Sequence, residues 1–521
     1  MSNLKDYAKL LTELPPPEGY EEIESYPIYG GRVFSAIKIL QEGLDALYYV
    51  IEPPLNEYEE VKNDILRRLE FVLPSIHEKK DKEKAIVETF DRIVESLKLK
   101  LEDEYYYHAL LYYVLRETLL YGPITPLMND RLIEDISCNG YNKPLYIYHR
   151  NYQNIRTNIT FSEDELDMFV IKLAQMSGKH ISIAEPLLDA SLPDGSRIQM
   201  TLAKEVTDHG STFTIRKFRD EPVTPVDLIA WGTFSIEQMA YLWLCIENKR
   251  SLIFAGGTAS GKTTSMNAVS IFIPRSSKIV TIEDTREIML PHENWIPAVT
   301  RETGKVVDMY DLLRAALRQR PEYIIVGEVR GKEALTLFQA MSTGHTTYST
   351  LHADSVNGVI HRLENPPINV PRAMIEALDI VSIQAQVFMG KKRVRRNLEI
   401  AEIIGVDPHT KIMRTTTVFT WDSSKDEHVM VGSSKALEEL RIMRNWSRKE
   451  LEQELKRREA VLKYMLDKNI RDFKEVARII QLYQVDPDKV MELVESWDDE
   501  KRAAKAGGKV SGNAEVLQEG P

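Results

Sequence analysis

The sequence predicts an α/β protein whose central part is a parallel sheet covered by helices. Short apolar runs alternate with helical patterns over residues 235–405, as expected for strands joined by crossover helices. One of these runs ends in a glycine-rich loop that opens a helix. Two other runs end in acidic residues, which places carboxylates at the edge of the sheet where open α/β sheets bind ligands.

Composition limits the expected partners. The chain of 521 residues carries 79 acidic and 67 basic residues, for a formal net charge of −12. Such a protein binds polyanions poorly unless its basic residues gather in one patch, so we expect no nucleic-acid partner. Cys138 and Cys245 have no metal-ligand spacing, and we expect both to be buried and reduced. We expect neither a secretory signal nor a membrane span, so the protein should be cytoplasmic and meet a membrane only through partners.

The strongest motif is the string Gly256-Gly-Thr-Ala-Ser-Gly-Lys-Thr263, which matches GxxxxGK[ST]. An apolar strand is expected before it at Ser251–Ala255 and a helix after it at Lys262–Ser270, which is the context that a phosphate-binding loop needs. Lys262 is predicted to contact the β and γ phosphates of ATP, and the Thr263 hydroxyl to bind Mg²⁺. The predicted nucleotide-binding residues are Gly256, Gly257, Thr258, Ala259, Ser260, Gly261, Lys262, Thr263 and Thr264.

Acidic residues end two neighbouring apolar runs. Tyr323–Glu328 is a strand pattern ending in Glu328, which could orient or deprotonate an attacking water; the alternative is a surface carboxylate that merely ends a strand. Lys278–Asp284 is a second such run. We expect Glu283 or Asp284 to assist the metal or the water.

Two histidines flank a further apolar run within Gly344–His352. Their separation of seven residues, with no third ligand nearby, is poor geometry for a protein-held metal. We predict instead that His345 senses the γ-phosphate through a hydrogen bond. For His352, a structural role and a functional role are nearly equally supported.

Taken in order, the segments Gly256–Thr263, Ile282–Glu287, Ile324–Arg330 and Gly344–His352 resemble the motor ATPases of type II secretion, type IV pili and the archaellum. The resemblance covers about residues 120–405. It implies a homo-hexamer that works on a polytopic membrane platform protein, at the inner face of the membrane. The chain lacks the four-cysteine zinc insertion of many bacterial members, so it looks like the archaeal branch, where archaellum, pilus and secretion motors are not separated.

The resemblance also assigns catalytic residues. The paired acids of that family correspond to Glu283 and Glu328, and its box histidines to His345 and His352. Its phosphate-contacting arginines fall at Arg197, Arg216 or Arg219. Whether such an arginine serves its own subunit or a neighbour stays open. An arginine beside a transferring phosphate would stabilise the spreading charge.

Proline and glycine clusters near Gly122 and Thr224 predict boundaries. The expected arrangement is an N-terminal α+β partner-binding region (1–120), a PAS-like α+β domain (121–220), a linker with a hinge at Thr224–Pro225 (221–234), a RecA-like P-loop ATPase domain (235–432), a helical C-terminal region opened by a Ser447–Glu450 capping box (433–500) and a disordered tail (501–521).

Together these features predict an ATP hydrolase that performs mechanical work. The main alternative is a P-loop nucleic-acid translocase. The basic run Lys391–Arg396 would have to serve it, and we interpret that run as a charged hairpin turn. A nucleotide-gated adaptor without turnover is a second alternative, against which Glu283 and Glu328 argue.

Overall fold

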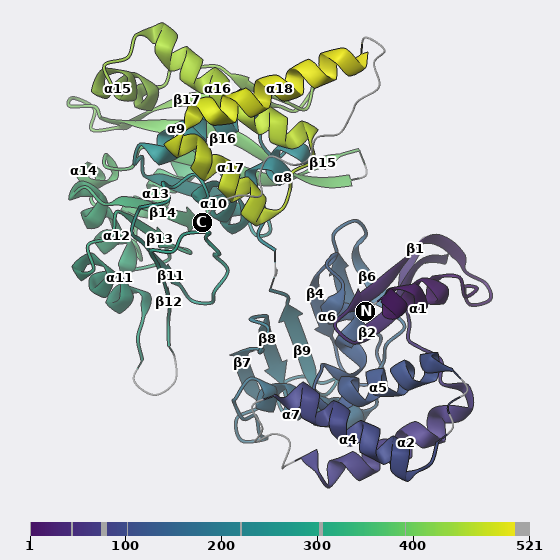
Figure 1. Cartoon of the computed structure of the whole chain (residues 1–521). Coiled ribbons are helices and arrows are strands. Elements are labelled where there is room, and N and C mark those ends of the chain that lie inside the picture. Colours follow the sequence, from purple (N-terminus) through teal and green to yellow (C-terminus); the bar gives the residue numbers. More distant parts are fainter. Residues whose placement is uncertain are drawn as a thin grey trace. The chain divides into compact units, whose positions relative to one another are not determined.

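The computed structural model describes residues 2–42, 45–73, 81–99, 101, 103–218, 221–301, 306–390 and 392–505. The chain forms two compact units, Met1–Arg219 and Asp220–Pro521 (Figure 1). Over its described residues each unit contains one nine-stranded sheet.

The first unit contains helices and strands in mixed order. They are α1 (Ser2–Thr12), β1 (Glu21–Gly30), β2 (Val33–Glu42), β3 (Asp45–Ile51), η1 (Asn56–Tyr58), α2 (Glu59–Glu70), α4 (Lys82–Ser96), α5 (Glu104–Thr118), η2 (Gly122–Ile124), α6 (Thr125–Asn129), β4 (Ile133–Cys138), β5 (Tyr146–His149), β6 (Gln153–Thr157), α7 (Glu163–Met176), β7 (Leu187–Ser191), β8 (Arg197–Thr201) and β9 (Thr212–Arg216).

The sheet of this unit runs without a break across the expected boundary at residue 120. Its order is β1-β2-β3-β6-β5-β4-β9-β8-β7, and β3 joins β6 in parallel while the other pairs are antiparallel. Ile37 and Ile39 of β2 pack into the same core as Ile136 and Phe213. A chain cut near Gly122 would therefore lose three strands and uncover this core, so such a truncation cannot isolate the predicted second domain cleanly.

A buried hydrogen-bond network reinforces this junction. The Asp130 carboxylate, with its residue 2% exposed, accepts from the hydroxyls of Tyr26 at 2.7 Å and Tyr48 at 2.6 Å. The Leu132 amide donates to its other oxygen at 2.8 Å. Buried polar groups that are fully paired favour one arrangement of the chain over others. The network thus joins β1 and β3 to the residues that follow the expected boundary.

The second unit contains the glycine-rich loop, the two runs that end in acidic residues and the histidine segment. Its elements are α8 (Pro225–Ala230), α9 (Ile236–Glu247), β10 (Leu252–Gly256), α10 (Lys262–Ser270), β11 (Ile279–Glu283), β12 (Trp295–Val299), α11 (Met309–Arg318), β13 (Tyr323–Val326), α12 (Glu333–Ser342), β14 (Thr346–Leu351), α13 (Val356–Glu364), α14 (Arg372–Ile375), β15 (Ile380–Met389), β16 (Lys392–Val406), β17 (Met413–Asp422), β18 (Glu427–Met430), α15 (Lys435–Met443), α16 (Arg448–Asp467), α17 (Phe473–Val485) and α18 (Pro487–Lys505).

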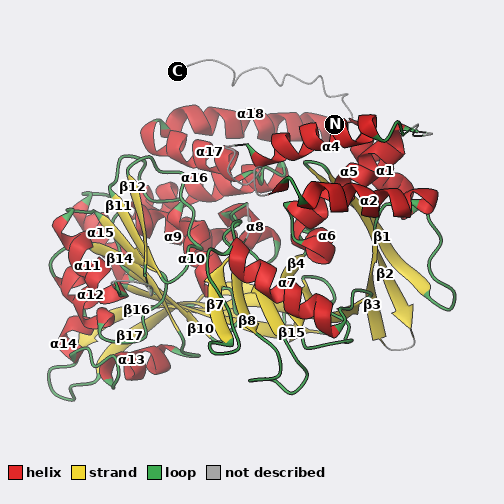
Figure 2. Cartoon of the chain, turned by 90° about the horizontal axis from the view of Figure 1, so that it is seen from below, coloured by secondary structure: helices red, strands yellow, loops and turns green. Residues whose placement is uncertain are grey.

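Its sheet has the order β12-β11-β13-β14-β10-β15-β16-β17-β18. The strands from β12 to β15 are parallel, and β16, β17 and β18 continue the sheet in antiparallel fashion. One core contains side chains of α11, α12, α13 and α14, and the other those of α8, α9, α10 and the C-terminal helices. Figure 2 shows α11 and α12 on one side of the strands and α9 and α10 on the other. Alternate residues of β10 enter the two cores, as expected for a strand covered on both faces.

Two expected segments differ in the structure. The linker 221–234 contains α8, and buried Thr224 accepts a hydrogen bond from the Asp227 amide at the start of this helix. The hinge expected at Thr224–Pro225 therefore coincides with a capped helix start. The expected disordered tail begins at residue 501, whereas α18 extends to Lys505 and residues 506–521 lie outside the described part. No helix among the described residues is long and apolar enough to cross a membrane.

Candidate nucleotide site

The loop after β10 has the backbone shape of a phosphate-binding loop. Every residue of β10 is buried, which fixes the start of the loop. Gly261 caps α10 in the left-handed conformation, with φ of 89°. A Cβ atom on Gly256 would lie 2.2 Å from the Gln384 carbonyl oxygen, so only glycine fits there. The loop therefore presents backbone N–H groups and the positive end of α10 at one place.

Lys262 lies in this loop with its side chain turned toward the loop backbone. The residue is 8% exposed, and its Nζ donates to the Gly257 carbonyl at 2.7 Å. Ser260 Oγ donates to the same oxygen at 2.8 Å. Gly257, Thr258 and Ala259 are exposed. Thr263 and Thr264, in the first turn of α10, are half-buried.

Glu328 follows β13 after Gly327 and has two charged neighbours. His352 Nε2 lies 3.2 Å from its Oε1, and Arg330 Nη2 lies 2.6 Å from its Oε2. Burial lowers the pKa of His352, the positive charge of Lys262 lowers it further, and Glu328 raises it. The charges of Lys262 and Glu328 thus both act on the pKa of His352. They do so because the carboxyl ends of β10, β13 and β14 meet at one edge of the sheet.

Glu283 ends β11 beside the same edge. The residue is 2% exposed, and its Oε1 accepts from the amides of Glu287 and Ile288, both at 2.9 Å. Its Oε2 is buried and has no hydrogen-bond partner among the described residues. Burial raises the pKa of Glu283 to about 7, against an ordinary value of 4.5. Asp284 is exposed and lies 3.9 Å from Arg330 Nη1.

The structure does not bring His345 to this edge. His345 directly precedes β14, whereas His352 directly follows it. A strand of this length spans about 20 Å, so the two histidines lie at opposite ends of it. The Nδ1 atom of His345 lies 3.3 Å from the Ala340 carbonyl oxygen and from the Thr343 hydroxyl, beside the end of α12. Within one subunit, this placement opposes the predicted contact of His345 with the γ-phosphate.

The predicted arginines belong to the first unit. Arg197 and Arg216 lie directly opposite each other on β8 and β9, and Arg216 also faces Asp135 on β4. Burial raises the pKa of Asp135, and the charge of Arg216 opposes that rise. Arg219 lies outside the described residues. Contact between these arginines and a nucleotide stays a prediction.

Three residues that sequence reasoning missed surround the site. Glu333, at the start of α12, accepts from the amides of Arg330 and Gly331 at 2.6 and 2.7 Å and so fixes the loop that carries Glu328. An acid in the first turn of a helix after the Glu328 strand is a signal that could have suggested it. Gln384 and Arg395 approach the P-loop from β15 and β16. Arg395 lies in the basic run Lys391–Arg396, whose pattern predicts a hairpin turn, and no local pattern marks Gln384.

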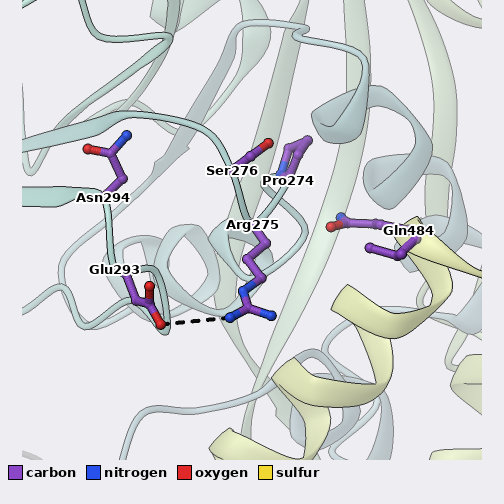
Figure 3. Close-up of a pocket in the computed structure, with 7 residues that line it drawn as sticks. Pro274, Arg275, Ser276, Glu293, Asn294 and Gln484 are labelled. Carbon is purple, nitrogen blue, oxygen red and sulfur yellow. Dashed lines mark ion pairs between the residues drawn. The ribbon is translucent and has the colours of Figure 1, made fainter. Parts of the chain in front are cut away.

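A surface pocket of about 420 Å³ lies away from this site. Three segments line it: the connection from α10 to β11, the residues just before β12, and the end of α17 (Figure 3). Arg275 and Glu293 point toward each other there, 3.7 Å apart. The pocket borders the amino ends of parallel strands, so it does not belong to the edge that carries Lys262 and Glu328.

Comparison with known proteins assigns the chain to a family. A family model described as type II/IV secretion system protein matches residues 121–443, more than half of the chain. The chain belongs to this family. Its fold is of the predicted α/β class, with a P-loop after β10, a preceding α+β unit and helices after the second sheet. A second model, described as PilB3-like, C-terminal, matches residues 426–507, which include α15, α16 and α17.

Individual proteins and one solved structure are also similar to this chain. Uncharacterized protein MJ0900 of Methanocaldococcus jannaschii is 42% identical over 379 residues, which cover 71% of this chain and 68% of that protein. Type IV secretion system protein PtlH of Bordetella pertussis is 30% identical over 306 residues, covering 51% of this chain and 90% of PtlH. The solved VirB11 ATPase of the Brucella suis type IV secretion system, in complex with sulphate, is 26% identical, covers 53% of this chain and 91% of that one, and has a TM-score of 0.28.

Proposed function

We propose that this secretion-family protein is a cytoplasmic, homo-hexameric ATPase that uses ATP and Mg²⁺ to assemble a pilus-type or archaellum-type filament or to drive protein secretion. The observation that carries the proposal is the P-loop, in which left-handed Gly261 starts α10 while Lys262 neighbours the Glu328–His352 pair. Similarity to a Methanocaldococcus jannaschii protein supports the archaeal branch.

The residues present fit a magnesium nucleotide. Backbone N–H groups of the loop and the positive end of α10 would bind the phosphates. Lys262 would exchange its bond to the Gly257 carbonyl for bonds to phosphate oxygens. The Thr263 hydroxyl stands in the first turn of α10, where it can bind Mg²⁺. The metal would neutralise charge on the β and γ phosphates.

Hydrolysis requires a group that accepts a proton from the attacking water. Glu328 is the first candidate, because His352 and Arg330 hold its two carboxylate oxygens in place. Glu283 is the second candidate, because a pKa of about 7 makes its carboxylate a stronger base than an ordinary glutamate while part of it stays deprotonated at neutral pH. The deprotonated form of either residue can take the proton and return it to product.

Partners remain part of the proposal. We propose that a polytopic membrane platform protein binds the hexamer at the inner face of the membrane and that residues 1–120 contribute to partner contacts. Family membership supports a role in a secretion-type machine. From Lys392 on, the run Lys391–Arg396 lies in β16 of the β15–β16 hairpin, where Arg396 forms an ion pair with Asp426. This local role of Arg396 argues against the translocase alternative.

The direct test measures phosphate release and mass together. Purified full-length protein with Mg-ATP should release phosphate. Light scattering of the nucleotide-bound protein should give the molar mass of six chains. Absence of phosphate release despite ATP binding would favour the adaptor. Salt-sensitive DNA binding that stimulates turnover would favour the translocase. Co-purification with a polytopic membrane protein would identify the platform.

A further inference from the structure

The β15–β16 hairpin borders the P-loop on the side away from Glu328. Strand β10 pairs in parallel with β14 on one side and β15 on the other, and Gly256 stands opposite Gln384. The close approach of the Gln384 carbonyl is what excludes a side chain at Gly256. The backbone of Gly256, where the P-loop begins, is therefore in direct contact with the backbone of Gln384 on β15.

A β-bulge occurs at this point of the hairpin. Ile383 faces Glu399, but the next residue, Gln384, faces Asn397, so Leu398 has no partner in the ladder. Asn397 fixes the bulge, since its Nδ2 donates to the Ile383 carbonyl at 3.1 Å and to the Ser382 hydroxyl at 2.8 Å. Bulges change the direction of side chains and are frequent beside active sites.

The bulge leaves the Gln384 amide beneath the start of α10. Gln384 is 1% exposed, and neither atom of its amide has a hydrogen-bond partner among the described residues. Its Oε1 lies 3.8 Å from the position that a Cβ on Gly261 would take. An unpaired buried amide is costly, and such groups require an explanation in a native structure. A change in the loop, or a group that arrives with nucleotide, could supply the missing partner.

Arg395 reaches the loop from the other strand of the hairpin. It faces Gln386, so it lies on the same face of the sheet as Gln384. Its Nε donates to the Ala259 carbonyl at 3.0 Å, at a residue whose φ is 59°. A guanidinium at this place holds the tip of the loop and adds positive charge beside the phosphate position.

The neighbouring Arg396 anchors the hairpin on the opposite face. Its guanidinium donates to both carboxylate oxygens of Asp426 at 2.7 Å and to the Trp231 carbonyl at 2.9 Å. Bidentate contacts of this kind fix geometry well. The strand that presents Arg395 is consequently held at a defined distance from the loop.

We propose that Arg395 and Gln384 are positioning residues of the nucleotide site. Arg395 holds the tip of the P-loop for the polyphosphate chain of a nucleoside triphosphate, and the Gln384 amide gains its partner when nucleotide binds. The inference rests on the proposed ATP-binding function. Gln384 and Arg395 would then form one side of the nucleotide site, and Glu283, Glu328 and His352 would form the opposite side.

The test for Arg395 uses full-length Arg395→Gln with Arg393→Gln as its matched control. Arg393 belongs to the same strand but is exposed, with its guanidinium 4.8 Å from the Phe388 ring. Arg395→Gln should weaken affinity for a fluorescent ATP analogue and raise KM about tenfold, as expected for loss of a charged hydrogen bond. Its kcat should match wild type, and Arg395→Lys should recover part of the affinity.

Gln384→Met provides the second arm, because methionine has a similar volume and no amide. It should raise the unfolding temperature without nucleotide and weaken ATP affinity, two changes of opposite sign. Equal ATP affinity in wild type and Arg395→Gln, or a fall in the nucleotide-free unfolding temperature of Gln384→Met, would overturn the inference. Failure of wild type to bind ATP would instead reject the proposed function.

Discussion

His352 Nε2 lies 3.2 Å from one carboxylate oxygen of Glu328. The pair joins the ends of β13 and β14, and the charge of Lys262 acts on the same imidazole. A carboxylate held in this way has a defined orientation, which a general base needs.

Replacement of Glu328 by glutamine should separate binding from turnover. The amide keeps the size of the side chain but cannot accept a proton from water, so the turnover rate should fall by about 100-fold or more. Affinity for a fluorescent ATP analogue should change little. Asp354→Asn, at an exposed position just after His352, is the control. A rate close to wild type would exclude Glu328 as the base and leave Glu283 as the next candidate.

Lys262→Ala should abolish nucleotide binding while the fold survives. The lysine donates to the Gly257 carbonyl of its own loop, and in the proposed complex it supplies positive charge to two phosphates, so its loss should affect nucleotide binding much more than the fold. Isothermal titration with ATP measures the effect, and circular dichroism checks the fold. Lys425→Ala, in the exposed turn between β17 and β18, should bind normally. Unchanged affinity in Lys262→Ala would place the phosphates elsewhere.

Glu283 should make stability depend on pH. Burial raises its pKa from 4.5 to about 7, so the folded state binds this proton more tightly than the unfolded chain. The free energy of unfolding therefore falls as the pH rises from about 4.5 to 7, by about 3 kcal/mol from this group. Glu283→Gln removes the titration, and urea unfolding at pH 5 and pH 8 measures the difference. Identical pH dependence in Glu283→Gln and wild type would contradict the assignment.

Tyr48→Phe should loosen the first unit. The change removes a hydrogen bond to buried Asp130, a loss of about 1–3 kcal/mol for a bond to a charged group. Hydrogen exchange in β1, β2 and β3 should become faster. Tyr29→Phe, on the exposed part of β1, should leave exchange unchanged. Equal protection in both variants would show that the network does not hold these strands.

At least one of Arg197, Arg216 and Arg219 should be required for turnover and not for initial binding. Alanine variants should retain affinity for a fluorescent nucleotide and lose rate, because arginine stabilises charge that spreads in the transition state. If the arginine acts across subunits, mixing with inactive Glu328→Gln chains should restore some activity. Normal hydrolysis by all three alanine variants would remove the arginines from the mechanism.

The sequence predicted the strands and the helix that carry the motifs well, because their signals are local. Helix α10 has the predicted bounds Lys262–Ser270, and β10, β11, β13 and β14 occupy the expected runs. A strand that ends in a motif directs that motif to a known edge of a parallel sheet. His345 shows the limit of this argument, since a motif that starts before a strand and ends after it must span both edges.

Long-range pairing accounts for what the sequence did not predict. Strand β1 contains glutamates and Pro27, which obscure the apolar pattern expected of a strand. It forms through its pairing with β2, and its place at the edge of the sheet tolerates a proline. The contact between Arg395 and Ala259 joins residues 136 positions apart and depends on the register after a bulge. The register of two strands after a bulge cannot be read from residue type and spacing, so this contact could not be predicted from the sequence.

The unbroken sheet of the first unit has a mechanical consequence. Strands joined edge to edge by hydrogen bonds tilt together, so we expect this sheet to move as one rigid body. Seven strand spacings of about 4.8 Å separate β8, which carries Arg197, from β1. A tilt of about 10° around β8 would move the far edge by about 6 Å at this spacing. If the proposed motor function tilts the arginine strands by this amount, the N-terminal strands would move by several ångströms.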